Sequence, residues 1–161
     1  MHFQINYSTR RIPNDVLVYR PEEFSFDVEP VPSGCFTSVL LNDLDLDIDE
    51  TGKVLSISGL CPHTKWVETK LIPPKSTIAE IIFVPDGPLL PGVCVSLDRE
   101  YLPVHFDRAS GWIRVQGGGK PSSPNSSIAL MCGVVFEINK RGDLCTLWLK
   151  PHKGLETLEL E

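Results

Sequence analysis

The sequence predicts an all-β protein, and three observations lead to this fold class. Short apolar or alternating runs recur along the whole chain, and turn-forming residues separate them at short spacing. Most of the 14 prolines and 12 glycines fall in the gaps between these runs. No segment shows an apolar stripe with the 3.6-residue period of a helix.

The strand-like runs follow one another along the chain. In the first part we expect strands at 2–6, 16–20, 24–29, 36–48, 54–60 and 66–72. In the last part we expect them at 101–106, 111–115, 128–138, 143–149 and 155–160. The runs 78–84 and 91–97 lie between these two groups. Residues 77–84 are the best helical candidate, but Ile81-Ile82-Phe83-Val84 followed by Pro85 favours a strand.

The chain carries an internal duplication. Residues 44–53 read LDLDIDETGK and residues 134–143 read VVFEINKRGD, with Gly52 and Gly142 separated by 90 positions (142 − 52 = 90). Each stretch places Asp or Asn first and glycine fourth in a turn, which is typical of a type I turn closed by a left-handed glycine in a G1 bulge. An apolar strand follows each turn. We therefore expect two related hairpins.

The duplication also predicts the domain organisation. We expect residues 1–161 to form a single domain from two related halves, at about 14–72 and 100–160. A β-rich connector at 73–99 joins them and is expected to add a hairpin. Two meanders whose apolar faces need covering should pack together as a sandwich or a partly closed barrel. The Gly-rich tract 117–125 is expected to be a long mobile hairpin loop.

The first half also resembles a known sequence pattern. A β-rich unit opens with Val16-Leu17-Val18-Tyr19 and ends with LDLDIDETGKVLSISGL. In this unit a strand, an acidic Asp-Glu-x-Gly turn and a second apolar strand follow one another. The pattern resembles the YuzE-like family of uncharacterised bacterial proteins over residues 14–62, and faintly over 100–150. That family has no agreed activity, so the resemblance implies no site residue.

Composition and charge exclude some classes of partner. The 15 basic and 21 acidic residues give a net charge of −6 and a pI near 5.2, which disfavours general nucleic-acid binding. No run approaches the ~20 apolar residues of a membrane helix, and the polar N-terminus does not resemble a signal peptide. We expect a cytoplasmic protein that binds neither nucleic acid nor membrane.

The cysteines fit a reducing compartment. The chain has five, an odd number, and none lies in a C-x-x-C pair, which argues against structural zinc and against a disulfide framework. Cys132 and Cys145 lie in apolar runs, where a small buried thiol fits. We therefore expect reduced cysteines.

The strongest local feature is a ladder of alternating aspartates. In a strand, Asp43, Asp45, Asp47 and Asp49 would line one face at a spacing of ~6.8 Å, and Glu50 follows them. The D-x-D-x-D spacing suggests a calcium loop, but Glu50 replaces the sharp-turn glycine and a serine replaces the bidentate glutamate, which excludes an EF-hand. The ladder is either a solvated face that prevents aggregation or a docking face for a cationic partner. The second half lacks its first two aspartates, so the fold does not require them.

Two histidines occupy matching places in the two halves. His63 and His152 each follow a proline, and Glu68 and Glu156 come shortly after them. If these four residues meet between the halves, they can form a metal-binding or acid–base cluster. Otherwise the Pro-His step is only a repeated turn.

No other residue set supports catalysis. The sequence has no serine nucleophile elbow, and Cys61 has no orienting partner beyond the nearby His63. The triple glycine near Lys120 lacks the helix that would complete a phosphate site. We therefore assign no catalytic residue, no metal and no cofactor.

These observations predict a small acidic module that binds another protein. The favoured subtype is an immunity or antitoxin-type inhibitor, because an acidic face speeds the encounter with a basic toxin and can occlude its active site. The alternative is a metal- or small-ligand-binding enzyme with its site between the two halves. A third hypothesis is a structural homodimer joined by an exposed edge strand.

Overall fold

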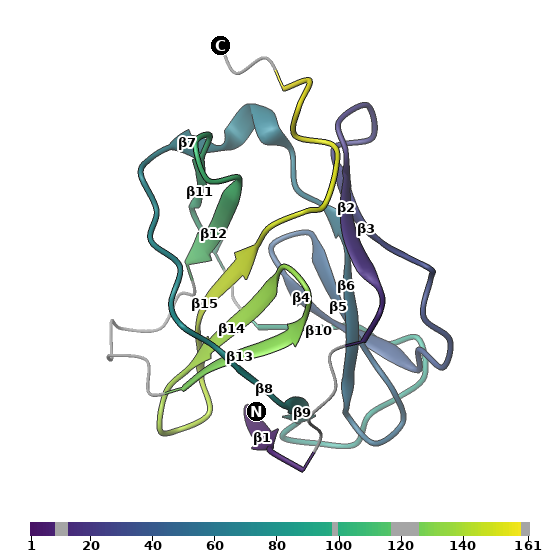
Figure 1. The fold of residues 1–161 in the computed structure, drawn as a ribbon. Coiled ribbons are helices and arrows are strands. Elements are labelled where there is room, and N and C mark those ends of the chain that lie inside the picture. Colours follow the sequence, from purple (N-terminus) through teal and green to yellow (C-terminus); the bar gives the residue numbers. More distant parts are fainter. Residues whose placement is uncertain (9–12, 98–99, 117–125, 159–161) are drawn as a thin grey trace.

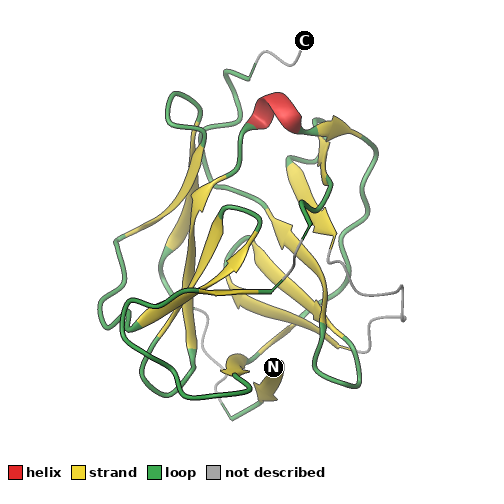
Figure 2. Ribbon diagram, turned by 180° about the vertical axis from the view of Figure 1, so that it is seen from behind, coloured by secondary structure: helices red, strands yellow, loops and turns green. Residues whose placement is uncertain are grey.

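The structure is a computed structural model that describes residues 1–8, 13–97, 100–116 and 126–158 (Figure 1). The predicted loop 117–125 lies outside these residues. The described part of the chain has no α-helix, and its one helical element is the 3-10 turn η1 at His63–Lys65 (Figure 2). None of its helical structure is long and apolar enough to cross a bilayer. The all-β prediction is confirmed.

Strands make up the regular structure of the described residues. In chain order they are β1 (His2–Asn6), β2 (Val16–Arg20), β3 (Ser25–Glu29), β4 (Thr37–Leu41), β5 (Leu44–Ile48), β6 (Val54–Leu60), β7 (Val67–Glu68), β8 (Thr77–Ile78), β9 (Glu80–Val84), β10 (Val95–Ser96), β11 (Val104–Asp107), β12 (Trp112–Gln116), β13 (Ser126–Met131), β14 (Val134–Ile138) and β15 (Leu144–Leu149). The predicted runs 36–48 and 128–138 are each divided into two strands by a two-residue turn, at Asn42-Asp43 and Cys132-Gly133.

The two halves of the chain form sheets of the same topology. The first sheet has the strand order β10-β4-β5-β6-β3-β2, and the second has the order β7-β11-β12-β15-β14-β13-β8. When β2 to β6 are matched in chain order with β11 to β15, these strands occur in the same spatial order in both sheets. The two sheets pack as a sandwich, and neither closes into a barrel. The predicted sandwich is confirmed, but neither half is a simple meander, because β3 pairs with β6 and β12 pairs with β15.

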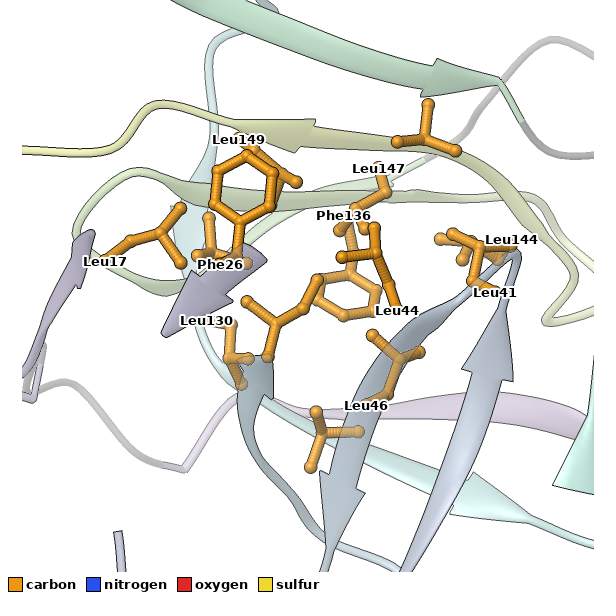
Figure 3. Packing of buried hydrophobic residues seen from close by; sticks show 14 of the residues in the cluster. Leu17, Phe26, Leu41, Leu44, Leu46, Leu130, Phe136, Leu144, Leu147 and Leu149 are labelled. Atoms are coloured by element: carbon orange, nitrogen blue, oxygen red, sulfur yellow. The ribbon is translucent and has the colours of Figure 1, made fainter. Parts of the chain in front are cut away.

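One hydrophobic core lies between the two sheets. Alternate side chains from facing strands fill it, including Phe26 and Leu46 from the first sheet and Phe136 and Leu147 from the second (Figure 3). All four are fully buried. Burial of one large aliphatic or aromatic side chain contributes about 1.5–3 kcal/mol. The shared core therefore holds the two halves together.

Each half also gives its last segment to the first strand of the other half. β7 pairs in parallel with β11. After β15, the amide of His152 donates a hydrogen bond of 2.7 Å to the carbonyl of Leu17, and the amide of Tyr19 donates one of 3.1 Å to the carbonyl of Lys153. Residues 152–153 thus lie along β2 as β7 lies along β11. This exchange joins the halves through backbone hydrogen bonds.

Both predicted G1-bulge hairpins are present. Gly52 and Gly142 have φ angles of +87° and +85°, in the left-handed region. The amide of each donates a hydrogen bond of 3.0 Å to the first residue of its turn, Asp49 or Asn139. The two turns contact a third, two-stranded sheet that β1 and β9 form.

Over its described residues, 73–97, the connector does not form the expected hairpin. Its strands β8, β9 and β10 pair with β13, β1 and β4, and none of them pairs with another. Since β4 and β13 are otherwise edge strands, the parallel additions of β10 and β8 cover those edges. The expected runs 66–72 and 91–97 shorten to the two-residue strands β7 and β10, and residues 155–158 form no strand.

The cysteines also differ in part from expectation. Cys132 is exposed, because it lies in the turn between β13 and β14, and Cys145 is only half-buried. Neither is the fully buried thiol that the apolar runs suggested. Cys35, Cys61, Cys94, Cys132 and Cys145 are all free thiols in the structure.

Candidate functional site

The acidic residues of the first half lie on the outer surface of the first sheet. In β5, Leu44, Leu46 and Ile48 are fully buried in the core. Because side chains alternate along a strand, Asp45 and Asp47 point to the opposite side, where both are half-buried. We call this surface the acidic face and define it by Asp43, Asp45 and Asp47 together with Ser38, Ser56 and Ser58 of the adjacent strands.

Asp47 is the centre of the hydrogen-bonding pattern on this face. One carboxylate oxygen accepts hydrogen bonds from the hydroxyls of Ser56 (2.8 Å) and Ser58 (3.5 Å) on β6. The other accepts one of 3.3 Å from Ser38 on β4 and lies 3.8 Å from the thiol sulfur of Cys35. Serines on both neighbouring strands thus fix the orientation of the Asp47 carboxylate without neutralising its charge.

Asp45 carries a charge that its surroundings do not favour. Burial raises the pKa of Asp45, and the neighbouring Asp47 raises it further, while a hydrogen bond from Ser38 acts in the opposite direction. Burial and the same Asp47 also raise the pKa of the Cys35 thiol. The acidic face therefore holds carboxylates close enough to repel each other.

Asp43 lies in the turn before β5 and is exposed. Among the described residues, no Lys or Arg forms an ion pair with any of the three aspartates of the acidic face. Carboxylates elsewhere on the same sheet are paired. Arg20 contacts Asp27 at 2.6 Å and Glu29 at 3.1 Å, and Lys153 contacts Glu29 at 3.0 Å. Asp43, Asp45 and Asp47 thus differ from Asp27 and Glu29, whose charges are paired.

The predicted ladder is shorter than expected, because Asp49 belongs to the hairpin turn. One oxygen of Asp49 accepts hydrogen bonds from the amide of Thr51 (2.8 Å), from its hydroxyl (2.6 Å) and from the amide of Lys53 (3.0 Å). Burial would raise the pKa of Asp49, but these hydrogen bonds lower it on balance. Glu50 is exposed at the tip of the turn. Asp49 therefore has a structural role, and the four carboxylates do not form one continuous row.

The corresponding surface of the second sheet is apolar and covered. Leu71, Ala129, Val135 and Trp148 are buried there in a second hydrophobic cluster, against which Ile78 packs. The segment between β7 and β8 runs across this face (Figure 1). Its position is fixed in part by Asp107, whose carboxylate accepts a hydrogen bond of 3.0 Å from the amide of Leu71. The protein's own chain thus occupies the outer surface of the second sheet.

The strand registers show that the two outer faces correspond. In the second sheet, Ile78, Ala129 and Val135 are register partners from β8 to β14. In the first sheet, the matching row is Ser96, Leu40 and Asp45, from β10 to β5. The same framework therefore carries an apolar row under a covering segment in the second sheet and a mixed row, with Asp45 half-buried, in the first.

His63 is part of an aromatic cluster at the end of the first sheet. The Tyr19 hydroxyl donates a hydrogen bond of 2.9 Å to the carbonyl of Cys61, and it lies 3.1 Å from the Nδ1 atom of His63. The His63 ring also contacts the Phe24 ring, with centroids 5.2 Å apart. Burial lowers the pKa of His63 and raises that of Tyr19. These contacts give His63 a packing role.

The other three residues of the predicted cluster have separate surroundings. Glu68 forms an ion pair of 3.5 Å with Arg108 and lines a hollow of about 530 Å³ that neither predicted histidine lines. The Glu156 carboxylate accepts a hydrogen bond of 2.8 Å from the amide of Gly154. Backbone hydrogen bonds lower the pKa of Glu156, and nearby His152 lowers it further. Within the described ranges, no three His, Cys, Asp or Glu side chains are grouped so that they could hold a metal ion.

Sequence reasoning missed several residues of this region. Ser56 and Ser58 alternate in the β6 run, and that spacing could have placed them beside the aspartates once the hairpin register was known. Phe24, Leu60 and Tyr101 are exposed apolar residues near the same end of the molecule. No local pattern marks them, because their proximity depends on the tertiary fold.

No protein-family model matches the sequence, and no curated protein matches it. The likeness to the YuzE-like family stays a prediction. The function is therefore argued from the site itself.

Proposed function

We propose that this protein binds another protein through the acidic face, and that the partner is basic. The observation that carries the proposal is the absence of any cation paired with Asp43, Asp45 or Asp47 within the described chain. A Lys or Arg side chain from a partner would offset the repulsion between Asp45 and Asp47. In the solvated-surface alternative, only water and dissolved ions offset this repulsion.

The shape of the face supports a protein partner over a small ligand. The aspartates and serines lie on adjacent strands of a sheet surface, whereas small-molecule sites are concave and mostly apolar. Polar side chains on a sheet surface can form hydrogen bonds and ion pairs with another protein. The net charge of −6 adds a long-range attraction for a basic partner.

Within this class we favour an immunity or antitoxin-type inhibitor. Enzymes that cut nucleic acid need basic surfaces to bind their substrate. An acidic sheet face can cover such a surface, accelerate the encounter and exclude the nucleic acid. The proposed partner is therefore a basic toxin domain, and the proposed mechanism is occlusion of its active site.

We place the proposed action in the cytoplasm. The five cysteines are free thiols, and Cys35, Cys94 and Cys132 are exposed. Exposed free thiols persist in a reducing compartment and tend to oxidise outside it. The alternative enzyme with a metal site at His63, His152, Glu68 and Glu156 receives no support, because these side chains are not grouped around one point.

The test is an association measurement with purified basic nuclease domains. Rates are recorded by stopped flow at ionic strengths of about 0.01 M and about 0.1 M, where the Debye length is about 30 Å and about 10 Å. We expect a cognate domain to associate faster at the lower ionic strength and to lose nuclease activity in the complex. Complete nuclease activity in a saturated complex would contradict inhibition by occlusion.

The matched variants are two double substitutions with the same change in net charge. Asp43→Asn with Asp45→Asn removes two charges from the acidic face, whereas Asp86→Asn with Asp143→Asn removes two charges from the β9–β10 connection and the second hairpin. We expect the first variant to slow association by about tenfold relative to the second. Equal rates for the two variants would show that the acidic face is only a solvated surface.

A further inference from the structure

An exposed apolar patch lies beside the acidic face. The side chains of Phe24, Leu60 and Tyr101 are 39%, 52% and 49% exposed. Phe24 is in the turn between β2 and β3, Leu60 is the last residue of β6, and Tyr101 precedes β11. Single exposed apolar residues are normal on a protein surface, but contiguous ones mark interaction sites. We call these three residues the apolar patch.

Hydrogen bonds place the segments that carry these three residues beside one another. The amide of Cys61 donates a hydrogen bond of 2.7 Å to the carbonyl of Phe24, which places that turn against the end of β6. The amide of Leu60 donates one of 2.9 Å to the carbonyl of Asp43. The amide of Leu102, next to Tyr101, donates a hydrogen bond of 2.7 Å to the side-chain oxygen of Asn42, the residue before Asp43. The patch is therefore continuous with the start of the acidic face.

Phe24 occupies a backbone conformation that a large side chain disfavours. Its φ angle is +55°, in the left-handed region. The matching turn of the second half, between β11 and β12, has Gly111 at this place, with φ of +74°. Glycine thus forms the same turn without strain. An exposed phenylalanine in this conformation is not required by the fold, and such strained positions cluster at functional sites.

The neighbouring residues hold the Phe24 ring in place. The His63 ring contacts it at a centroid distance of 5.2 Å, and the Tyr19 hydroxyl accepts a hydrogen bond of 3.1 Å from the His63 amide. Phe24 therefore packs on His63 of the turn η1, and Tyr19 holds His63 by a hydrogen bond. The β2–β3 turn and η1 lie at the same end of the molecule (Figure 1). The Phe24 ring is therefore held in position before a partner binds.

We propose that the apolar patch binds an aliphatic or aromatic side chain of the same basic partner that the acidic face attracts. This inference rests on the proposed function and adds a second contact to it. Charge complementarity identifies the occupant. The carboxylates of Asp43, beside Leu60, and of Glu22 and Glu23, which precede Phe24, outnumber the cation of Lys65, whose Nζ lies 5.3 Å from the centroid of the Tyr101 ring. The occupant is therefore an apolar side chain flanked by Lys or Arg. The acidic face governs the encounter, and the patch governs the lifetime of the complex.

Two fluorescent peptides of equal charge test the proposal, KLKWKLK and KSKSKSK. We expect the full-length protein to bind the first about tenfold more tightly than the second. Phe24→Asn and Leu60→Ser should remove this preference and leave the binding of KSKSKSK unchanged. Asparagine is chosen at position 24 because it tolerates the left-handed conformation. The control is Ile72→Ser, which removes an equally apolar residue that is 80% exposed elsewhere. It should leave both affinities unchanged.

The outcomes for the apolar patch and for the basic partner can be distinguished. Equal affinity of the two peptides for the unmodified protein would overturn the apolar patch, even if both bind through the aspartates. A preference for KLKWKLK that Asp43→Asn with Asp45→Asn does not weaken would support the patch and contradict the proposed basic partner. A protein dimer that Leu60→Ser dissociates would show that a second copy covers the patch, and it would overturn the proposal.

Discussion

Phe3 and Phe83 are register partners in the β1–β9 ladder, and each donates its amide hydrogen to a left-handed glycine of one hairpin turn. The amide of Phe3 bonds to the carbonyl of Gly142 and that of Phe83 to the carbonyl of Gly52, both at 2.7 Å. The two hydrogen bonds are therefore equivalent: Phe3 and Gly142 in one correspond to Phe83 and Gly52 in the other. A pseudo-twofold axis therefore passes between Phe3 and Phe83. The small central sheet joins the turns of both halves.

The glycines at these two contacts should not tolerate a side chain. A Cβ atom at Gly52 would lie 2.3 Å from the carbonyl oxygen of Phe83, and one at Gly142 would lie 2.5 Å from that of Phe3. We expect Gly52→Ala and Gly142→Ala to lower the free energy of unfolding by about 1–3 kcal/mol more than Gly34→Ala does. Gly34 is the matched control, since it has φ of +88° but no atom within 4 Å of a Cβ. Urea denaturation measures the difference, and equal losses at all three sites would contradict the docking of the turns.

Asp49 should affect stability and not partner binding. Asp49→Ala removes the acceptor of three hydrogen bonds, and we expect a loss of about 1–2 kcal/mol. Because the pKa of Asp49 is lowered in the folded protein, its charge stabilises the fold above the unfolded pKa of about 3.9, and this contribution is lost as the pH falls through the folded value. Asp49→Asn should remove that pH dependence, as unfolding followed between pH 2 and 7 would show. If the basic partner associates more slowly with Asp49→Asn, Asp49 is part of the docking surface and this prediction is wrong.

Asp45 should behave in the opposite way. Its pKa is raised in the folded protein, so ionisation of Asp45 costs stability at pH values above its unfolded pKa of about 3.9. We expect Asp45→Asn to raise the free energy of unfolding at neutral pH, by less than about 1 kcal/mol. The gain should disappear in acid, where the carboxyl group is protonated in both states. Thermal unfolding at pH 7 and pH 3 tests this, and a variant destabilised at pH 7 would show that the Asp45 charge is satisfied within the fold.

Phe24 should also lower the stability of the unbound protein, because its backbone is in the left-handed region. A non-glycine residue in the left-handed region is disfavoured by about 1–2 kcal/mol, and asparagine suffers less than other residues. We expect Phe24→Asn to leave the midpoint of thermal unfolding unchanged or to raise it, although the contact with His63 is lost. Gly111→Asn in the matching turn is the control, and it should lower the midpoint because it replaces a glycine at φ of +74°. A large loss of stability in Phe24→Asn would instead assign Phe24 a structural role.

The local parts of the fold could be predicted from the sequence, and the exchanged parts could not. The turns at Gly52 and Gly142 follow from turn chemistry within five residues, so their prediction did not depend on the rest of the chain. The pairing of residues 152–153 with β2, and of β1 with β9, joins segments that are far apart in the sequence. Apolar alternation predicts that a strand exists but does not specify its neighbour.

The site shows the same division. The alternation in β5 correctly separated Asp45 and Asp47 from the buried leucines, because the period of two is a local property. It wrongly extended the row to Asp49, whose side chain bonds within its own turn. The match of His63 with His152 was also misleading. His63 lies in the 3-10 turn η1, whereas His152 extends directly along β2, so the Pro-His steps have different backbone structures.

The most direct test of the account is a titration of the labelled protein with KLKWKLK, followed by the amide resonances in NMR spectra. We expect the perturbed amides to cluster in β4, β5 and β6 and around Phe24, Leu60 and Tyr101, and we expect added salt to reverse the changes. The amides of β13 and β14, which the segment between β7 and β8 covers, should not move. Perturbations concentrated on the second sheet, or a spectrum unchanged at saturating peptide, would contradict the acidic face as the docking surface.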